Sequence, residues 1–373
     1  MNQRFTALSL LAALLVVASL AGTVFAQDTT DTLPAHALYV QRTPHLVGGA
    51  PTPATPLTTW NGSFKYLGKT YKYNMVGTAP GSGKSTTFPV VIVPIVLQYK
   101  KGTTTTTFTP ATKQSNGLNA IQNTIASPIF QNMDWTTPDG VDLGTTQYED
   151  AFQRGNFWTM VSKAPGYHIL LGKPQVLKPQ VFVVPAGDGS VGTEFGVKVG
   201  LADINWFDAK LETIISNTAV IQPNTLPIFI AYNVYLTESG ECCVGGYHSS
   251  MTTTSGTQAY SYFGYVGKSG VFGQDVSALS HEAGEWMDDP LVVETGGNPV
   301  ACGILEVGDP EEGFNQDGAV YGAFPYTLNG FTYHLQDLVY LEYFGAPKTT
   351  SVDSGAESFH DNPFGLGICN NGG

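Results

Sequence analysis

The pattern of apolar and polar positions predicts β-strands through much of the first two thirds of the chain. Residues 65–75 alternate through aromatic side chains, which is the period of a strand with one buried face. The segment 88–99, FPVVIVPIVLQY, is apolar and rich in β-branched residues, as is typical of a strand buried on both faces. Shorter segments of the same kind predict further strands at 168–171, 176–184 and 227–236.

Helical periodicity of apolar residues appears in four segments, at 118–125, 147–161, 206–216 and 275–289. Near the end of the chain, Asn329-Gly330 is a typical two-residue turn within a predicted hairpin at 325–344. This mixture predicts an α+β fold. We expect a β-rich N-terminal part with helices, residues 58–219, to pack against a C-terminal part, residues 220–373.

The first 26 residues have the features of a secretory signal. Arg4 precedes an apolar run at 7–20, and small residues at 24 and 26 form a cleavage site. We therefore expect a secreted or periplasmic protein, without a membrane span after the signal is removed. The Thr- and Pro-rich residues 27–57 are predicted to be a flexible lead-in.

The composition changes the range of partners that we expect. The chain has 373 residues, of which only 13% are charged, and its formal net charge is −13. Such an acidic protein is not expected to bind nucleic acid or anionic membranes, but it can bind cations.

The segment LSHEAGEWMDDP at 279–290 carries the strongest candidate chemistry. On a helical wheel, one side is apolar and is predicted to pack inward. The other side holds one imidazole and four carboxylates: His281, Glu282, Glu285, Asp288 and Asp289. Asp275 is the predicted N-cap, and Pro290 is expected to end the helix.

An acidic region without basic residues surrounds this helix. Residues 269–347 contain no Lys or Arg but 13 Asp and Glu residues. Carboxylates one helical turn apart repel each other, so a bound cation is the simple way to offset their charge. The alternative is that most of these acidic side chains face water.

His281 and Glu285 are one helical turn apart, a spacing that lets two side chains bind one ion. A third ligand must come from elsewhere, and we expect Glu306, with Asp309 as the competitor. Glu282 is then expected to be the general base next to an activated water rather than a ligand. Zn²⁺ is the expected ion. A ligand set of one His and two carboxylates is hard enough that Ca²⁺ or Mn²⁺ are alternatives.

Four cysteines, Cys242, Cys243, Cys302 and Cys369, permit disulfides in an exported protein. A bond between the adjacent Cys242 and Cys243 is geometrically awkward. Two pairings therefore remain, each joining both of these residues to Cys302 and Cys369. A thiolate metal site is an alternative that lacks the usual C-x-x-C spacing.

The order HEAGEWMDDPL, ILEVGDPEEG and YTLNGFTYHLQDLVYLEYF resembles plant phosphate-induced, exordium-like extracellular proteins and related secreted bacterial proteins. The segment CCVGGYHSS at 242–250 is similar to a Cys-Gly-Phe-His segment of that family. The resemblance implies a zincin-like fold. Its motifs match His281, Glu282, Glu285, Glu306 and Asp309 and, less firmly, His248.

These observations lead to a functional hypothesis, a secreted metal-dependent hydrolase that acts on peptides or an extracellular polymer. One alternative is a non-catalytic extracellular scaffold whose site holds structural Ca²⁺ or is vacant. Another is a glycosidase that uses the paired carboxylates of Glu282 and Glu306. For His248 an architectural hydrogen bond is the expected role, with substrate binding as the alternative, and His168, His334 and His360 are interpreted as structural.

Overall fold

The computed structural model describes residues 54–291, 299–300, 303–312, 320–352 and 358–360. The chain divides into a first unit, 1–35, and a second unit, 36–373, so all described residues belong to the second. The predicted signal, most of the lead-in, Cys302 and Cys369 lie outside the described residues. Within the described part, no helix has the length and apolar character needed to cross a membrane.

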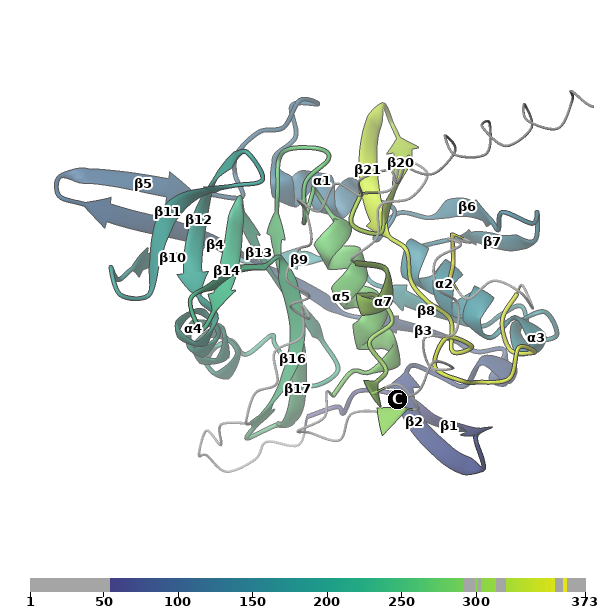
Figure 1. Ribbon diagram of the computed structural model, residues 1–373. Coiled ribbons are helices and arrows are strands. Elements are labelled where there is room, and N and C mark those ends of the chain that lie inside the picture. The colour runs from purple at the N-terminus through teal and green to yellow at the C-terminus, as the bar shows by residue number, and fades with distance from the viewer. Residues whose placement is uncertain (1–53, 292–298, 301–302, 313–319, 353–357, 361–373) are drawn as a thin grey trace, which may run out of the picture. The chain divides into compact units, whose positions relative to one another are not determined.

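A seven-stranded, mostly parallel sheet forms the centre of the fold (Figure 1). Its main path runs in the order β10 (Gln180–Val184), β4 (Val90–Lys101), β13 (Leu226–Tyr232), β17 (Gly256–Tyr265) and β16 (Gly246–Thr253). The first four strands are parallel neighbours, and β16 pairs antiparallel with β17. The strands β5 (Thr104–Phe108) and β9 (Gln175–Val176) also pair with β4. Because β4 and β13 pair directly, the sheet joins strands from the predicted N-terminal and C-terminal parts.

A second sheet has four strands, β11 (Gly189–Glu194), β12 (Val197–Asp203), β14 (Val234–Glu238) and β15 (Glu241–Val244). Five two-stranded pairs complete the β-structure: β1 (Thr59–Tyr66) with β2 (Lys69–Val76), β3 (Ser85–Phe88) with β8 (His168–Leu171), β6 (Met133–Thr136) with β7 (Asp142–Thr146), β18 (Pro299–Val300) with β19 (Gly303–Ile304), and β20 (Ala323–Leu328) with β21 (Phe331–Gln336). The predicted turn of the last pair is confirmed, because Asn329 and Gly330 both have positive φ, 51° and 78°.

The described helices are α1 (Ala120–Ala126), α2 (Tyr148–Asn156), α3 (Trp158–Val161), α4 (Ile204–Asn217), α5 (Ser277–Asp288) and α7 (Asp309–Glu312), with a 3₁₀ turn, η1, at Pro80–Ser82. The short helix α1 begins with a capping box, in which the Asn119 and Gln122 side chains bond each other's backbone N–H groups. Asp203 caps α4 through the backbone N–H of Trp206, at 2.9 Å. The helices and strands together confirm the predicted mixed α+β class.

Local backbone geometry divides several segments that the sequence pattern predicts as single elements. Residues 65–75 span the turn at Leu67-Gly68 between β1 and β2, and residues 176–184 are divided between β9 and β10.

Two further interruptions occur within the core. The predicted strand 227–236 is two strands, because Asn233 has a φ of 49° and leads the chain from β13 into β14 of the other sheet. The predicted helix 147–161 is interrupted at Phe157, between α2 and α3. Both interruptions lie within apolar surroundings, which the hydrophobic pattern does not distinguish from a continuous element.

Helix α5 lies between the central sheet and a group of elements that includes α2, β2 and β21 (Figure 1). It contacts β16 and β17 of the sheet, and also α2, β2 and β21. Its apolar residues Leu279, Trp286 and Met287 belong to one large cluster of buried side chains. The Trp286 ring packs edge-on against Phe88, with ring centroids 5.4 Å apart. Neighbours on all sides therefore bury the helix that carries the candidate chemistry.

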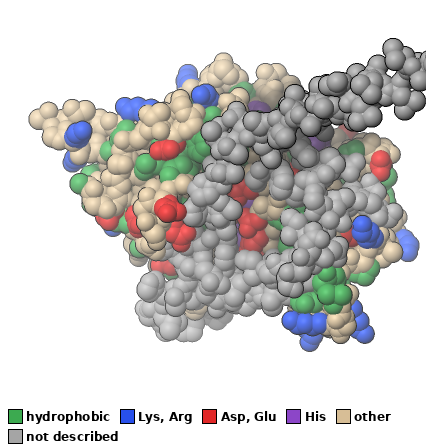
Figure 2. Space-filling model, viewed as in Figure 1, with side chains coloured by type: hydrophobic (Ala, Val, Ile, Leu, Met, Phe, Trp, Pro, Cys, Tyr) green, Lys and Arg blue, Asp and Glu red, His purple; other side chains and the backbone are tan. Residues whose placement is uncertain are grey.

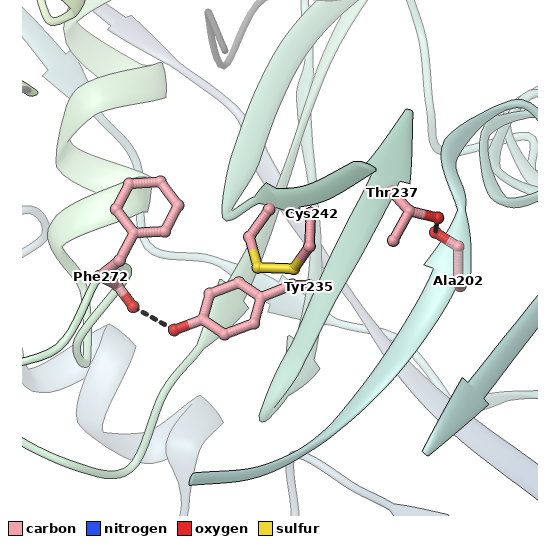
Figure 3. The surroundings of a disulfide bond; sticks show 6 residues. Ala202, Tyr235, Thr237, Cys242 and Phe272 are labelled. Atoms are coloured by element: carbon pink, nitrogen blue, oxygen red, sulfur yellow. Dashed lines mark hydrogen bonds between the residues drawn. A yellow bond between two sulfur atoms is a disulfide. The ribbon is translucent and has the colours of Figure 1, made fainter. Parts of the chain in front are cut away.

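The predicted cysteine pairing is wrong for Cys242 and Cys243, which form a disulfide with each other (Figure 3). The peptide bond between them is cis, and their Cα atoms are 3.0 Å apart. The prediction treated a bond between adjacent cysteines as geometrically awkward and therefore joined each of them to a distant cysteine. The ring of Tyr235 lies beside the disulfide, and its hydroxyl donates to the carbonyl oxygen of Phe272.

Candidate metal centre

Helix α5 differs from the predicted amphipathic helix because its polar side is also buried. All twelve residues from Ser277 to Asp288 are buried, including the three candidate residues His281, Glu282 and Glu285. Strand β16 and the segment 305–309 place His248 and Glu306 among the polar side chains of this helix. The polar side therefore forms an internal cluster rather than a solvated surface.

The predicted N-cap is also wrong. Val276 occupies the N-cap position and makes no side-chain cap bond. Asp275 has a φ of 39°, and its carboxylate accepts a bond from the backbone N–H of His334 while it lies 2.6 Å from the His334 ring. Asp275 thus joins the start of α5 to β21 instead of capping the helix.

His281 contacts two carboxylates. Its Nε2 atom lies 2.9 Å from Oε1 of Glu285 and 3.5 Å from Oδ1 of Asp309. Burial alone would lower the pKa of His281, but the Glu285 and Asp309 carboxylates raise it well above its usual value. Of the two residues expected to complete the site, Asp309 is therefore the one that the structure records next to the His281 imidazole.

His248 lies on strand β16 and contacts three carboxylates. Its Nδ1 atom lies 3.4 Å from Oε2 of Glu282, 3.4 Å from Oε2 of Glu285 and 3.8 Å from Oε2 of Glu306. On the other side of the ring, Nε2 is 3.0 Å from the carbonyl oxygen of Asp289. Burial would lower the pKa of His248, but its bonds to Glu282 and Glu285 raise it to about 10.

Two glycines allow the backbone to approach these side chains closely. A Cβ atom at Gly308 would lie 2.5–2.7 Å from atoms of the His281 ring, and one at Gly246 would lie 2.9 Å from Oε1 of Glu282. The backbone N–H of Gly308 also donates to Oε1 of Glu285, at 3.1 Å. Both positions thus require a residue without a side chain.

Burial of the acidic residues contradicts the alternative in which most of them face water. Nine of the thirteen acidic residues in 269–347 are buried: Asp275, Glu282, Glu285, Asp288, Asp289, Glu306, Glu311, Asp337 and Glu342. Burial raises the pKa of Glu282 to about 7 and that of Glu306 well above its usual value. Although burial also acts on Glu285, the neighbouring imidazoles hold its pKa far below normal.

Several buried polar atoms of the cluster make no hydrogen bond within the described residues. They are both ring nitrogens of His281, Oε1 of Glu282, both carboxylate oxygens of Glu306 and Oδ1 of Asp309. Leaving a buried polar atom without a hydrogen bond costs about 1–3 kcal/mol. An ion that accepts lone pairs from these atoms would offset that cost.

The donor set and its spacing are suited to a divalent cation. Two groups hold their ligand atoms within 4.8 Å of one another, His281 with Glu285 and Asp309, and His248 with Glu282 and Glu285. Ligand atoms that bind one ion at about 2.0–2.2 Å, with angles of about 90–110°, are about 2.9–3.5 Å apart. The four contacts within these two groups, from 2.9 to 3.5 Å, fall in this range.

The free space recorded beside His281 is small. A cavity of about 10 Å³ is lined by His281 together with Phe272, Ser277 and Tyr321. This volume is sufficient for about one water molecule.

The sequence predicts an architectural hydrogen bond for His248, with substrate binding as the alternative. In the structure, His248 lies within the cluster. It lies 33 residues before His281, on a strand whose pairing with β17 places it against α5. The only sequence signal was its place in the family-like segment CCVGGYHSS. The other described histidines contact residues outside the cluster: His168 contacts Asp150, His334 contacts Asp275, and His360 stacks on Phe324.

Charged side chains are distributed unevenly over the surface. Figure 2 shows Lys and Arg side chains at the periphery of one face and acidic side chains nearer its middle.

Comparisons with family models, with curated proteins and with solved structures found no match to this chain. We therefore infer function from the residues of the site itself.

Proposed function

We propose that the protein is a secreted metal-dependent hydrolase with a zincin-like active helix, and that its substrates are peptides. The observation that carries the proposal is the grouping of His281, Glu285 and Asp309, with Glu282 on the next position of the same helix. The signal-like N-terminus supports secretion, and the resemblance to exordium-like proteins implies the zincin-like helix without implying an activity.

Each side chain has a distinct part in this proposal. His281, Glu285 and Asp309 would hold the ion, and Gly308 would fix the Glu285 carboxylate through its N–H group. A divalent ion there supplies Lewis-acid chemistry, because it polarises a carbonyl group and lowers the pKa of water. Glu282 would take a proton from the attacking water and pass it to the leaving amine. Its pKa of about 7 suits proton transfer near neutral pH.

The burial of the site favours a second candidate, an extracellular scaffold with a structural cation. His281, Glu282 and Glu285 are each no more than 1% exposed, and the cavity beside His281 has room for about one water. In that case the ion would contribute to stability and no substrate would reach it.

One variant separates the two candidates. Glu282→Gln removes the proton acceptor but keeps the size of the side chain. For a hydrolase, we expect cleavage of casein or a fluorogenic peptide to fall at least 100-fold while the metal content, measured by plasma mass spectrometry, is unchanged. The matched control is Glu238→Gln, at an exposed position on β14, which should retain full activity.

Two results would contradict the hydrolase. The first is no cleavage by the wild-type protein with any of Zn²⁺, Mn²⁺ or Ca²⁺. The second is cleavage that survives both EDTA and Glu282→Gln. A lower melting temperature in EDTA without any turnover would identify the scaffold.

A further inference from the structure

The two carboxylate oxygens of Glu285 face two different histidines. Oε1 lies 2.9 Å from Nε2 of His281, and Oε2 lies 3.4 Å from Nδ1 of His248. Glu285 is therefore shared by the two potential ligand groups. A carboxylate that offers one oxygen to each side has the geometry of a bridging ligand between two ions.

The orientation of the His248 ring directs a lone pair into the second group. A carbonyl oxygen can only accept a hydrogen bond, so Nε2 of His248 must carry the proton that it directs at the carbonyl of Asp289. In the neutral ring, Nδ1 is then unprotonated and directed at the carboxylates of Glu282, Glu285 and Glu306. A hydrogen bond from the far nitrogen to a backbone carbonyl is the usual support of a metal-binding imidazole.

Glu306 provides an independent indication of a ligand. Its side chain is 3% exposed, and neither carboxylate oxygen has a hydrogen-bond partner within the described residues. Oε2 nevertheless lies 3.8 Å from Nδ1 of His248. Keeping such a carboxylate buried is costly unless a cation or a proton neutralises it.

In a metal-bound state, with all four carboxylates ionised and both imidazoles neutral, the charge of the cluster would be balanced by two divalent ions rather than by one. Four carboxylates contact the two imidazoles, from Glu282, Glu285, Glu306 and Asp309, with a total charge of −4 when ionised. The segment 269–347 offers no Lys or Arg to offset this charge. With both rings neutral, one divalent ion leaves −2 and two leave zero.

We propose that the cluster binds a second divalent cation, held by His248, Glu282 and Glu285 together with the more distant Glu306, and that Glu285 bridges the two ions. The inference depends on the proposed function to the extent that the first ion uses the other oxygen of Glu285. Two-metal sites hold their ions about 3.5–4 Å apart, a separation that one carboxylate can span. Oxygen-rich ligands with one imidazole each suit Mn²⁺ or Zn²⁺.

The test is the metal content of the protein after loading with Mn²⁺ and removal of unbound Mn²⁺ by gel filtration. We expect two Mn²⁺ per chain by plasma mass spectrometry, with the paramagnetic resonance spectrum of a spin-coupled pair. His248→Gln should reduce the content to one uncoupled ion, because the His281 group is retained. Glu306→Gln is the second variant should His248→Gln not fold, and Glu238→Gln is the control that should keep both ions.

The outcomes separate this inference from the proposed function. One ion per chain at saturation, or two ions without spin coupling, would overturn the bridged pair and leave the single-ion hydrolase standing. Two coupled ions in His248→Gln or Glu306→Gln would also overturn it. If the wild-type protein binds no ion at all, the proposed function fails together with the inference.

Discussion

At the scale of single residues, position within the cluster decides the chemistry more than residue type does. Glu282 and Glu285 have the same side chain on the same helix, yet burial raises the pKa of Glu282 to about 7 while nearby imidazoles hold that of Glu285 far lower. One carboxylate is therefore suited to accept a proton and the other to bind a cation. A helical wheel shows that the two are neighbours but not that Glu285 contacts the imidazoles of both His248 and His281 while Glu282 contacts that of His248.

Asp288 gives a prediction of how stability depends on pH. Burial raises its pKa to about 8, and its carboxylate accepts a hydrogen bond from Gln153. Between about pH 4 and pH 8 the unfolded chain releases this proton while the folded chain retains it, so stability falls as the pH rises toward 8. Asp288→Asn cannot ionise. In EDTA, its melting temperature should fall several degrees less between pH 5 and pH 8.5 than that of the wild-type protein.

Calorimetry at a series of pH values measures this difference. The control is Asp142→Asn on β7, an exposed position whose side chain accepts a bond from Gly144. This variant should follow the wild-type pH profile. If the Asp288→Asn and wild-type profiles are parallel, Asp288 is ionised in the folded protein.

At the scale of elements, the site depends on a close approach between α5 and the segment 305–309. The sequence predicts α5 from its 3.6-residue period, and the structure confirms a helix from Ser277 to Asp288. The sequence pattern does not show that β16 and the 305–309 segment cover the polar side of α5, because those contacts involve residues that are distant in sequence. The hairpin at Asn329-Gly330 was predictable because its turn chemistry is local.

Gly308→Ala tests this approach. The new Cβ would lie 2.5–2.7 Å from the His281 ring, so either the ring or the 305–309 segment must move. We expect a loss of stability of about 1–3 kcal/mol and a metal affinity at least tenfold lower by isothermal titration. Gly187→Ala, where a Cβ meets no atom within 4 Å, is the control and should bind metal normally. Unchanged affinity in Gly308→Ala would contradict the described approach.

At the scale of the whole molecule, the cluster joins three parts of the fold. His248 comes from the central sheet, Glu285 from α5, and Asp309 from the start of α7. Ions bound by these side chains would cross-link the three parts in the folded state only, so their removal should destabilise the entire protein.

We therefore expect EDTA to lower the melting temperature and added Zn²⁺ or Mn²⁺ to restore it. At an ion concentration 100 times the Kd, binding contributes about 2.7 kcal/mol, which for a chain of this size corresponds to a shift of about 4 °C. The double variant His248→Gln/His281→Gln should melt at the same temperature with and without chelator. A wild-type protein that does not respond to EDTA would show that no ion supports the fold.

The sequence alone predicts the α+β class, the helices at α1, α2, α4 and α5, about half of the strands and the hairpin turn at Asn329-Gly330, but not β16, which carries His248, or its neighbour β17. These features follow from local periodicity and turn chemistry, which are written in neighbouring residues. Four features appear only in the folded structure: the acidic side of α5 is buried, Asp309 lies beside His281, His248 joins the cluster and Cys242 bonds Cys243. The first three depend on contacts between segments far apart in sequence, which a pattern of apolar and polar positions does not contain.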